Sequence, residues 1–171
     1  LHTLPQFHCN GWGMVYAVTA MGGTHVVLRK VDGAEILRRV DKHGITLLLG
    51  APAVANAIID ASPQFDSGVP GRGTVRIVVA GAPPPSKTIE RVETELGWQF
   101  HQIYGLTETS PVLTINSPRP ETDHLTPAER SVVLSAAGVP TIGTEMATSS
   151  SGEVMARSNT VMDGYWNQPD A

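Results

Sequence analysis

The sequence predicts an α/β protein, with a parallel sheet flanked by helices and short β pieces at the C-terminal end. Two observations predict this class. Up to residue 103, short apolar runs alternate with segments whose apolar residues recur at helical spacing. The apolar runs also lack the polar–apolar alternation of a half-exposed strand, which favours a parallel sheet covered on both faces. The expected order of elements up to residue 103 is therefore βαβαβαβ.

The first helix of this series is marked by signals at both of its ends. Residues 24–28, THVVL, are predicted to form a short buried strand. Asp32 lies three residues before Glu35, a capping-box spacing with Asp in place of Ser or Thr, so a helix is predicted to begin there. Gly44 is a natural end for this helix, and residues 45–49, ITLLL, form the second predicted strand.

Breaker-rich segments separate the next elements. Residues 50–52 turn the chain into a predicted helix, and residues 62–73, with two prolines and three glycines, form a predicted surface loop. Residues 75–80 contain four β-branched side chains and no breaker, which makes them the strongest predicted strand. A turn at residues 81–85 and a further helix lead to the next strand, residues 98–103.

The pattern changes in the last third of the chain. Residues 111–116 are compatible with one more strand. Thr126 and Glu129 form a second capping box, with proline in the first helical position, so another helix is predicted to follow. Short strand-like pieces come after it, of which residues 153–157 are the clearest.

Composition excludes several classes of function. The 171 residues are enough for one domain with a real core. Charged residues make up only 16%, and the net charge of −4 excludes a basic field for nucleic acid. A single cysteine, Cys9, excludes a disulfide framework, and we expect its side chain to be buried and inert. No membrane-length apolar run and no signal-peptide pattern is present, so we predict a cytoplasmic protein, or part of one, with at most peripheral membrane contact.

Two turns stand where a parallel sheet binds its ligands, at the carboxyl ends of strands: residues 81–85 and 104–108. In the second turn, Thr107 can donate to a phosphate oxygen, and Glu108 is a hard oxygen ligand suited to Mg²⁺ beside phosphates. Tyr104 offers a flat face to a nucleotide base. A surface turn with a helix cap explains the same residues equally well.

Two further segments have both a structural and a functional interpretation. The small residues of 80–85 let a planar ligand approach the backbone, although an ordinary strand-to-helix turn has the same composition. His8 and Trp12, in a glycine-flanked loop before an apolar helix, are suited to line a pocket, although a lone histidine is more often structural. The six histidines show no metal-ligand spacing, and no Ser-His-Asp triad is recognisable.

Together these segments resemble the adenylate-forming superfamily of acyl-CoA synthetases, luciferases and peptide-synthetase adenylation domains. Residues 104–109, YGLTET, match the family's aromatic-Gly-x-Thr-Glu motif, and residues 80–85 stand where the family has its Gly-Gly-Ala-Pro turn. Residues 4–8, LPQFH, match its Pro-x-Phe-His segment, and residues 161–170, VMDGYWNQPD, its Met-x-Gly-Tyr-Trp-Asn-x-Pro stretch. The resemblance spans the whole chain, and residues 8–12, HCNGW, are most similar to the fatty and medium-chain acyl-CoA ligases.

The resemblance implies a ligase that uses ATP, Mg²⁺ and coenzyme A. A fatty or other hydrophobic carboxylic acid is first joined to AMP with release of pyrophosphate, and coenzyme A then displaces AMP to give a thioester. The alternatives are an adenylation domain that loads a carrier protein, and a non-catalytic core that binds adenine or is purely structural.

The same resemblance assigns roles to individual residues. Among the catalytic residues it implies, His8 faces the reacting carboxylate, Thr107 contacts the α-phosphate and Glu108 holds Mg²⁺. Tyr104 stacks on adenine, and Trp12 gates an acyl tunnel. The implied cofactor-binding set is Gly81, Ala82, Pro83, Tyr104, Gly105 and Thr107. The implied wall of the tunnel is formed by Gly50, Ala51, Pro52 and Val54.

Departures from the family pattern predict an internal fragment of the large N-terminal domain. The lysine-containing phosphate loop is expected upstream of Leu1, and the ribose-binding aspartate and the C-terminal domain beyond Ala171. We therefore expect the isolated chain to be inactive, with the remainder of its own N- and C-terminal domains as partners. Residues 146–153 are shorter than the family pattern, through a deletion or through missing residues. Residues 1–116 are expected to form an α/β subdomain with the acyl and adenine sites, and residues 117–171 a connecting segment that begins an incomplete β-rich subdomain.

Overall fold

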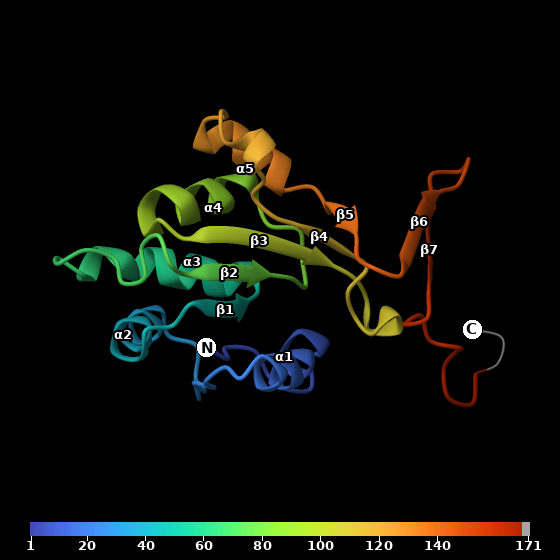
Figure 1. The fold of residues 1–171 in the computed structure, drawn as a ribbon, viewed down its shortest axis with the longest axis horizontal. Coiled ribbons are helices and arrows are strands. Elements are labelled where there is room, and N and C mark those ends of the chain that lie inside the picture. Colours follow the sequence, from blue (N-terminus) through green and yellow to red (C-terminus); the bar gives the residue numbers. More distant parts are fainter. Residues whose placement is uncertain (169–171) are drawn as a thin grey trace.

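The main feature of the fold is a five-stranded sheet with a helix layer (Figure 1). The computed structural model describes residues 1–168, apart from the side chains of Cys9 and Asn10, so the expectation for Cys9 and positions 169–170 of the tail motif lie outside the described residues. The strands of the sheet are β1 (Leu47–Gly50), β2 (Arg76–Val79), β3 (Gln99–Tyr104), β4 (Thr114–Asn116) and β5 (Val139–Pro140). They lie in this order; β1, β2 and β3 pair parallel, whereas β4 and β5 join antiparallel. This confirms the predicted α/β class.

The α-helices begin and end where local sequence signals place them. They are α1 (Cys9–Ala20), α2 (Gly33–His43), α3 (Pro52–Ala61), α4 (Ser86–Arg91) and α5 (Pro127–Leu134). At the start of α2, the Asp32 side chain accepts a hydrogen bond from the Glu35 backbone N–H at 2.8 Å, and after its end Gly44 adopts a left-handed φ of 58°. Thr126 and Glu129 form the predicted capping box of α5. Both capping predictions are confirmed.

Short helices and a hairpin complete the described chain. A π-helix (Val92–Leu96) continues α4, and 3₁₀ helices occupy Ser62–Gln64, Thr107–Thr109 and Pro120–Thr122. Strands β6 (Thr144–Thr148) and β7 (Val154–Ser158) form a separate antiparallel pair. In the turn between them the Ser149 N–H donates to the Glu153 carbonyl oxygen at 2.9 Å, so the short stretch at 146–153 closes a complete hairpin.

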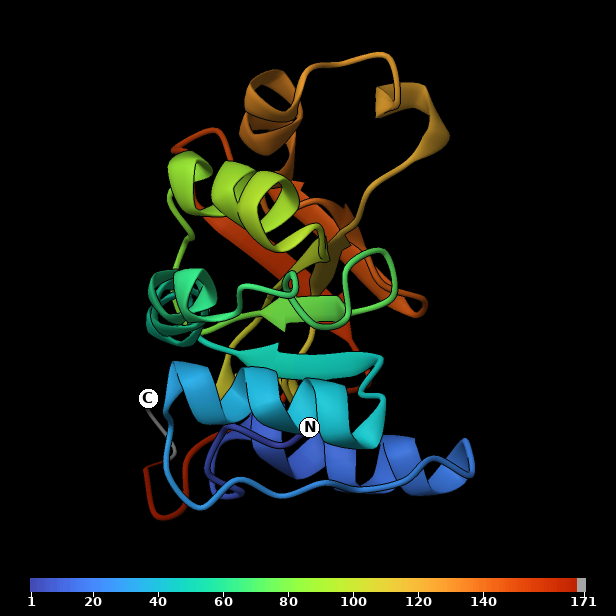
Figure 2. The same cartoon turned by 90° about the vertical axis from the view of Figure 1, so that its left-hand side faces the viewer.

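The core lies on one face of the main sheet. Leu48, Ile77 and Phe100 are register partners on β1, β2 and β3, and all three are fully buried. They pack with apolar side chains of α2, α3, α4 and α5, and α3 and α4 lie next to each other along the strands (Figure 2). On the other face, α1 covers the β1 edge across a cavity of about 570 Å³, while Ile115 of β4 stays 38% exposed within the described residues. The cover predicted for both faces of the parallel strands is therefore found at β1, whereas the antiparallel β4, which lies outside that prediction, is partly exposed.

The predicted strand at residues 24–28 is wrong. Val27 forms only an isolated bridge with His2 and stays 60% exposed. The reason is that the N-terminal residues insert between this segment and β1. His2 also bridges Leu49 of β1, and its N–H donates to the Val26 carbonyl oxygen at 2.9 Å. Residues 24–28 thus pair at the outer edge through one residue instead of a ladder.

The glycine-flanked segment becomes helical directly after His8, so Trp12 lies in α1 and not in the predicted loop, whereas His8 lies in the loop that precedes it. α1 begins at Cys9, and the His8 carbonyl oxygen accepts hydrogen bonds from the N–H groups of Gly11 and Trp12, both at 2.8 Å. A Cβ at Gly11 would lie 2.3 Å from the Pro5 carbonyl oxygen. Glycine therefore lets the first turn of α1 pack directly against the incoming chain.

Two other predictions concern the chain as a whole. None of the helices that the structure describes has both the length and the apolar character needed to cross a membrane. The division after residue 116 stays a prediction; β5, which lies beyond it, pairs with β4 in the main sheet.

The connection between β3 and β4 provides a test of the packing. A Cβ at Gly105 would lie 1.6 Å from the Pro111 carbonyl oxygen. We therefore expect Gly105→Ala to lower the free energy of unfolding of the intact protein by about 3 kcal/mol, the upper range for overpacking. Gly13→Ala in α1 is the matched control, because no atom lies within 4 Å of its added Cβ. Urea denaturation measures both variants, and an unchanged stability of Gly105→Ala would contradict this packing.

Candidate functional site

The carboxyl ends of β1, β2 and β3 lie side by side. Gly50, Val79 and Gln102 are register partners, and the Ala80 N–H donates to the Gly50 carbonyl oxygen at 3.2 Å. Each of these strand ends leads into one predicted segment: the tunnel turn, the adenine turn or the Tyr104 motif. The three segments therefore lie together at the edge formed by the carboxyl ends of the strands (Figure 1). This is the edge at which parallel sheets bind ligands.

The segment that carries His8 reaches the same edge. Residues 1–3 run parallel to β1, with a bridge between His2 and Leu49 and a hydrogen bond from the Thr3 hydroxyl to the Leu49 carbonyl oxygen. The chain therefore leaves this pairing toward the carboxyl end of β1, and α1 starts there with His8 as its N-cap. The structure thus brings all four sequence-predicted segments to one edge of the sheet.

The turn after β3 is held by a buried hydroxyl. The Thr109 Oγ1 accepts a hydrogen bond from the Leu106 N–H at 3.0 Å. The same hydroxyl donates to the Pro111 carbonyl oxygen at 2.9 Å, and Thr109 is only 5% exposed. The Leu113 N–H donates to the Tyr104 carbonyl oxygen at 2.9 Å. These contacts fix the backbone on both sides of the 3₁₀ helix Thr107–Thr109, from which the predicted phosphate-binding side chains emerge.

Glu108 is the charged side chain of this turn. Its Oε1 accepts a hydrogen bond from the Tyr165 hydroxyl at 2.5 Å, and its carbonyl oxygen accepts one from the Met162 N–H at 2.8 Å. The Tyr165 hydroxyl, followed by a backbone hydrogen bond of Glu108 itself, lowers the pKa of the Glu108 carboxyl, while slight desolvation opposes this. The same contact raises the pKa of Tyr165. Glu108 is therefore ionised at neutral pH, beside the exposed Thr107.

The predicted adenine turn exposes its backbone. Gly81, Ala82 and Pro83 are all exposed between β2 and α4, whereas Pro84 is buried and anchors the turn. Gly81 has a φ of 93°, a conformation that favours glycine. A planar ligand can therefore approach the main chain here without meeting a large side chain.

The predicted tunnel residues are divided between core and surface. Gly50 and Val54 are buried together, since a Cβ at Gly50 would lie 3.1 Å from the Val54 Cβ. Trp12 is 57% exposed on α1, and its ring packs edge-on against Tyr16 with centroids 5.2 Å apart. The cavity between α1 and β1 is lined by Leu49. It is lined by none of the predicted tunnel residues, which are Trp12, Gly50, Ala51, Pro52 and Val54.

The residues present fit a metal ion only in combination with a substrate. Within residues 1–168 as described, no group of three or more His, Cys, Asp and Glu side chains could hold a metal ion. Glu108 alone therefore suits Mg²⁺, which commonly takes one or two carboxylates and completes its coordination with phosphate oxygens and water. His8 is exposed, and its ring packs against Phe7 with centroids 4.4 Å apart.

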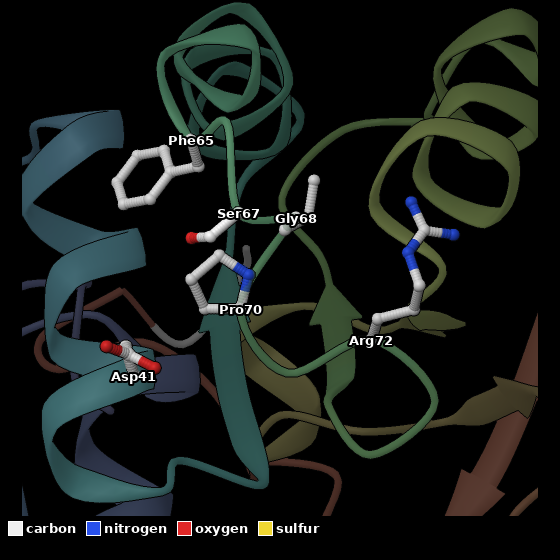
Figure 3. Close-up of a pocket in the computed structure, with 7 residues that line it drawn as sticks. Asp41, Phe65, Ser67, Gly68, Pro70 and Arg72 are labelled. Carbon is white, nitrogen blue, oxygen red and sulfur yellow. The ribbon is translucent and has the colours of Figure 1, made fainter.

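A second hollow lies near the amino ends of the strands, opposite the candidate site. It has a volume of about 370 Å³ and is formed by α2 and the loop that leads into β2 (Figure 3). Asp41 and Arg72 flank it, with Phe65, Ser67 and Pro70 between them. Since it faces the amino ends of the strands, it contains none of the sequence-predicted site residues.

Tyr165 is the site residue that sequence reasoning missed. It belongs to the tail stretch that carries part of the family resemblance, yet no role was attached to it. Its partner Glu108 is 57 positions away, and a single hydrogen bond over such a separation leaves no local signal in the sequence.

Comparisons with known proteins identify the family of this chain. The sequence matches the AMP-binding enzyme family over residues 1–166. It is 37% identical to probable acyl-activating enzyme 10 of Arabidopsis thaliana and 38% identical to the 2-methylpropanoate–CoA ligase CCL4 of Humulus lupulus. Each alignment covers 99% of this chain and 32% of the relative. The chain therefore spans about a third of the length of these curated relatives.

Solved structures show the same fold. The N-terminal domain of FACL13 from Mycobacterium tuberculosis superposes with a TM-score of 0.77 at 21% identity, covering 98% of this chain and 42% of that one. The o-succinylbenzoate coenzyme A synthetase MenE from Bacillus subtilis, in complex with ATP and magnesium ion, gives a TM-score of 0.75 at 22% identity, over 96% and 34%. The sequence match over nearly the whole chain and this shared fold show that the chain belongs to the AMP-binding enzyme family, the adenylate-forming superfamily that includes acyl-activating enzymes and acyl-CoA ligases.

Proposed function

We propose that the intact protein activates a carboxylic acid with ATP and transfers the acyl group to coenzyme A. The observation that carries the proposal is the placement of His8, the turn at 81–83 and residues 104–108 at one edge of a parallel sheet. Relatives named as CoA ligases for 2-methylpropanoate, for acetate or butyrate and for acetate support it, and they favour coenzyme A over the alternative of a carrier-protein acceptor.

The proposed reaction has two steps. A carboxylate oxygen of the acid attacks the α-phosphorus of ATP, and pyrophosphate leaves with the electron pair of the broken P–O bond. The thiol of coenzyme A then attacks the acyl carbon and loses its proton, and AMP leaves. Both steps require mainly positioning and neutralisation of phosphate charge from the protein, which a small set of well-held polar groups can supply.

In this proposal the turn after β3 holds the phosphates and the base. Glu108, whose Oε1 accepts a hydrogen bond from the Tyr165 hydroxyl, would be one ligand of Mg²⁺, and Mg²⁺ would supply positive charge at the phosphates. The exposed Thr107 donates its hydroxyl to the α-phosphate. Tyr104, at the end of β3, stacks on adenine, and the exposed backbone at 81–83 contacts the ring.

The acid is proposed to be hydrophobic, with His8 facing its carboxylate and Trp12 at the mouth of its site. The relatives named for acetate, butyrate and 2-methylpropanoate make short and branched aliphatic acids the first substrates to test. Fatty acids are the longer members of the same chemical series.

The first test concerns the metal ligand. Glu108→Gln keeps the shape of the side chain and removes its charge, so we expect the rate of ATP–pyrophosphate exchange by the intact protein to fall by about 100-fold. Glu121→Gln is the matched control, because Glu121 is exposed on the 3₁₀ helix Pro120–Thr122. Full exchange activity in Glu108→Gln would refute the assignment of Mg²⁺ to this carboxylate.

The second test concerns the acid. Trp12→Ala removes an exposed ring at the start of α1, so we expect kcat/KM for long acids relative to acetate to rise about tenfold with an unchanged KM for ATP. Met21→Ala, an exposed apolar residue just beyond the other end of α1, should leave the ratio unchanged. Parallel kinetics over an acid series, from acetate to long-chain fatty acids, measure the effect. An altered KM for ATP with no shift between acids would place Trp12 outside the acid site.

The third test concerns residues 1–171 alone. The family resemblance places a lysine-containing phosphate loop outside this stretch, so we expect a polypeptide limited to these residues to form no acyl-CoA. Thioester formation followed by mass spectrometry checks this, with the intact protein as the positive control. Thioester produced by the short polypeptide would show that residues 1–171 suffice.

A further inference from the structure

The segment that follows β7 contacts the candidate metal ligand on two sides. We call this segment, residues 159–168, the tail loop; it lies beside the 3₁₀ helix Thr107–Thr109 (Figure 1). The Met162 N–H donates to the Glu108 carbonyl oxygen at 2.8 Å, and the Tyr165 hydroxyl donates to Glu108 Oε1 at 2.5 Å. One loop therefore fixes both the backbone and the side chain of Glu108.

The tail loop also holds Tyr165 in place. At its start, the Val161 N–H donates to the carbonyl oxygen of Ser158, the last residue of β7, at 3.3 Å. At its end, the Gln168 N–H donates to the Tyr165 carbonyl oxygen at 3.2 Å, and Asn167 closes the turn with a φ of 56°. Backbone hydrogen bonds thus connect the segment that carries the Tyr165 phenol to β7, to Glu108 and within the loop.

The two carboxylate oxygens of Glu108 have different surroundings. Oε1 accepts a hydrogen bond from the Tyr165 hydroxyl, whereas no other residue within the described range 1–168 donates a hydrogen bond to Oε2. Carboxylates that ligate metals are commonly hydrogen-bonded by a neighbouring group that sets their orientation. When one oxygen of a carboxylate is already held, the side chain loses little further conformational entropy as the other oxygen binds a cation.

We propose that Tyr165 is a positioning residue for the metal site: its hydroxyl holds Oε1 of Glu108, so that Oε2 is presented to the Mg²⁺ that accompanies ATP. This inference rests on the proposed function, in which Glu108 is a ligand of Mg²⁺. Tyr165 itself touches neither ATP nor the acid in this arrangement. It acts through Glu108, and its effect should appear in the use of Mg²⁺ and not in the affinity for the acid.

The experiment compares ATP binding with and without Mg²⁺. Isothermal titration calorimetry on the intact protein gives the Kd for ATP in EDTA and in saturating Mg²⁺, and the ratio of the two measures what Mg²⁺ contributes. In Tyr165→Phe we expect this ratio to fall by about 10- to 100-fold, the usual effect of removing a group that orients a metal ligand. The Kd for ATP in EDTA and the KM for the acid should stay unchanged.

Tyr16→Phe is the matched control. It makes the same chemical change on an exposed tyrosine of α1, so the Mg²⁺ ratio should remain that of the unaltered protein. Tyr165 is 48% exposed, so Tyr165→Phe is also expected to keep the thermal midpoint of the unaltered protein. A Mg²⁺ effect at constant thermal stability separates positioning from a general loss of structure.

The outcomes distinguish the inference from the proposed function. If Glu108→Gln loses the Mg²⁺ effect and Tyr165→Phe keeps it, the role of Tyr165 is refuted and the role of Glu108 stands. If Glu108→Gln also keeps it, the proposed metal ligand itself is refuted. A stronger Mg²⁺ effect in Tyr165→Phe would overturn the inference in the opposite sense, since the hydroxyl would then compete with the metal.

Discussion

The parallel register of β1, β2 and β3 is the constraint on which the candidate site depends. It sets Gly50, Val79 and Gln102 side by side, so that loops distant in sequence leave the sheet at one edge. The register is specified by the fully buried row of side chains on the helix-covered face, because a slip of one residue would turn that row to the other face. The packing of the core therefore also determines where the site lies.

Glu108 joins two parts of the chain that the family resemblance identifies separately. The motif at residues 104–109 supplies the carboxylate, and the tail stretch at 161–170 supplies the Met162 N–H and the Tyr165 hydroxyl that hold it. The structure thus brings both stretches into contact at Glu108. The turn after β3 carries the Glu108 carboxylate, and the tail loop restricts the orientation of that side chain.

Local signals in the sequence were enough to place most elements. Asp32 and Gly44 bound α2 because caps act within one helical turn. Three of the four β-branched residues at 75–80 lie in β2, as their strand propensity predicts. The common edge of the predicted turns followed from the parallel sheet alone. The roles assigned to individual site residues stay predictions.

Features that depend on distant partners could not be predicted in this way. Residues 24–28 have strand composition, but the N-terminal segment occupies the place beside β1 that they would need. Trp12 lies in α1, whose first turn packs at Gly11 against Pro5, and composition does not reveal this contact. The contact between Tyr165 and Glu108 joins residues from separate parts of the fold and has no local pattern.

The antiparallel return of β4 has a consequence for the order in which this region folds. β3 and β4 are joined by a short connection, so their pairing closes a small loop and loses little chain entropy. The pairing of β1 with β2 must instead wait until a whole helix and a long surface loop have been ordered between them. During folding, the backbone that displays Thr107 and Glu108 can therefore take shape early, whereas the turn at 81–83 is placed beside it only when the parallel strands assemble.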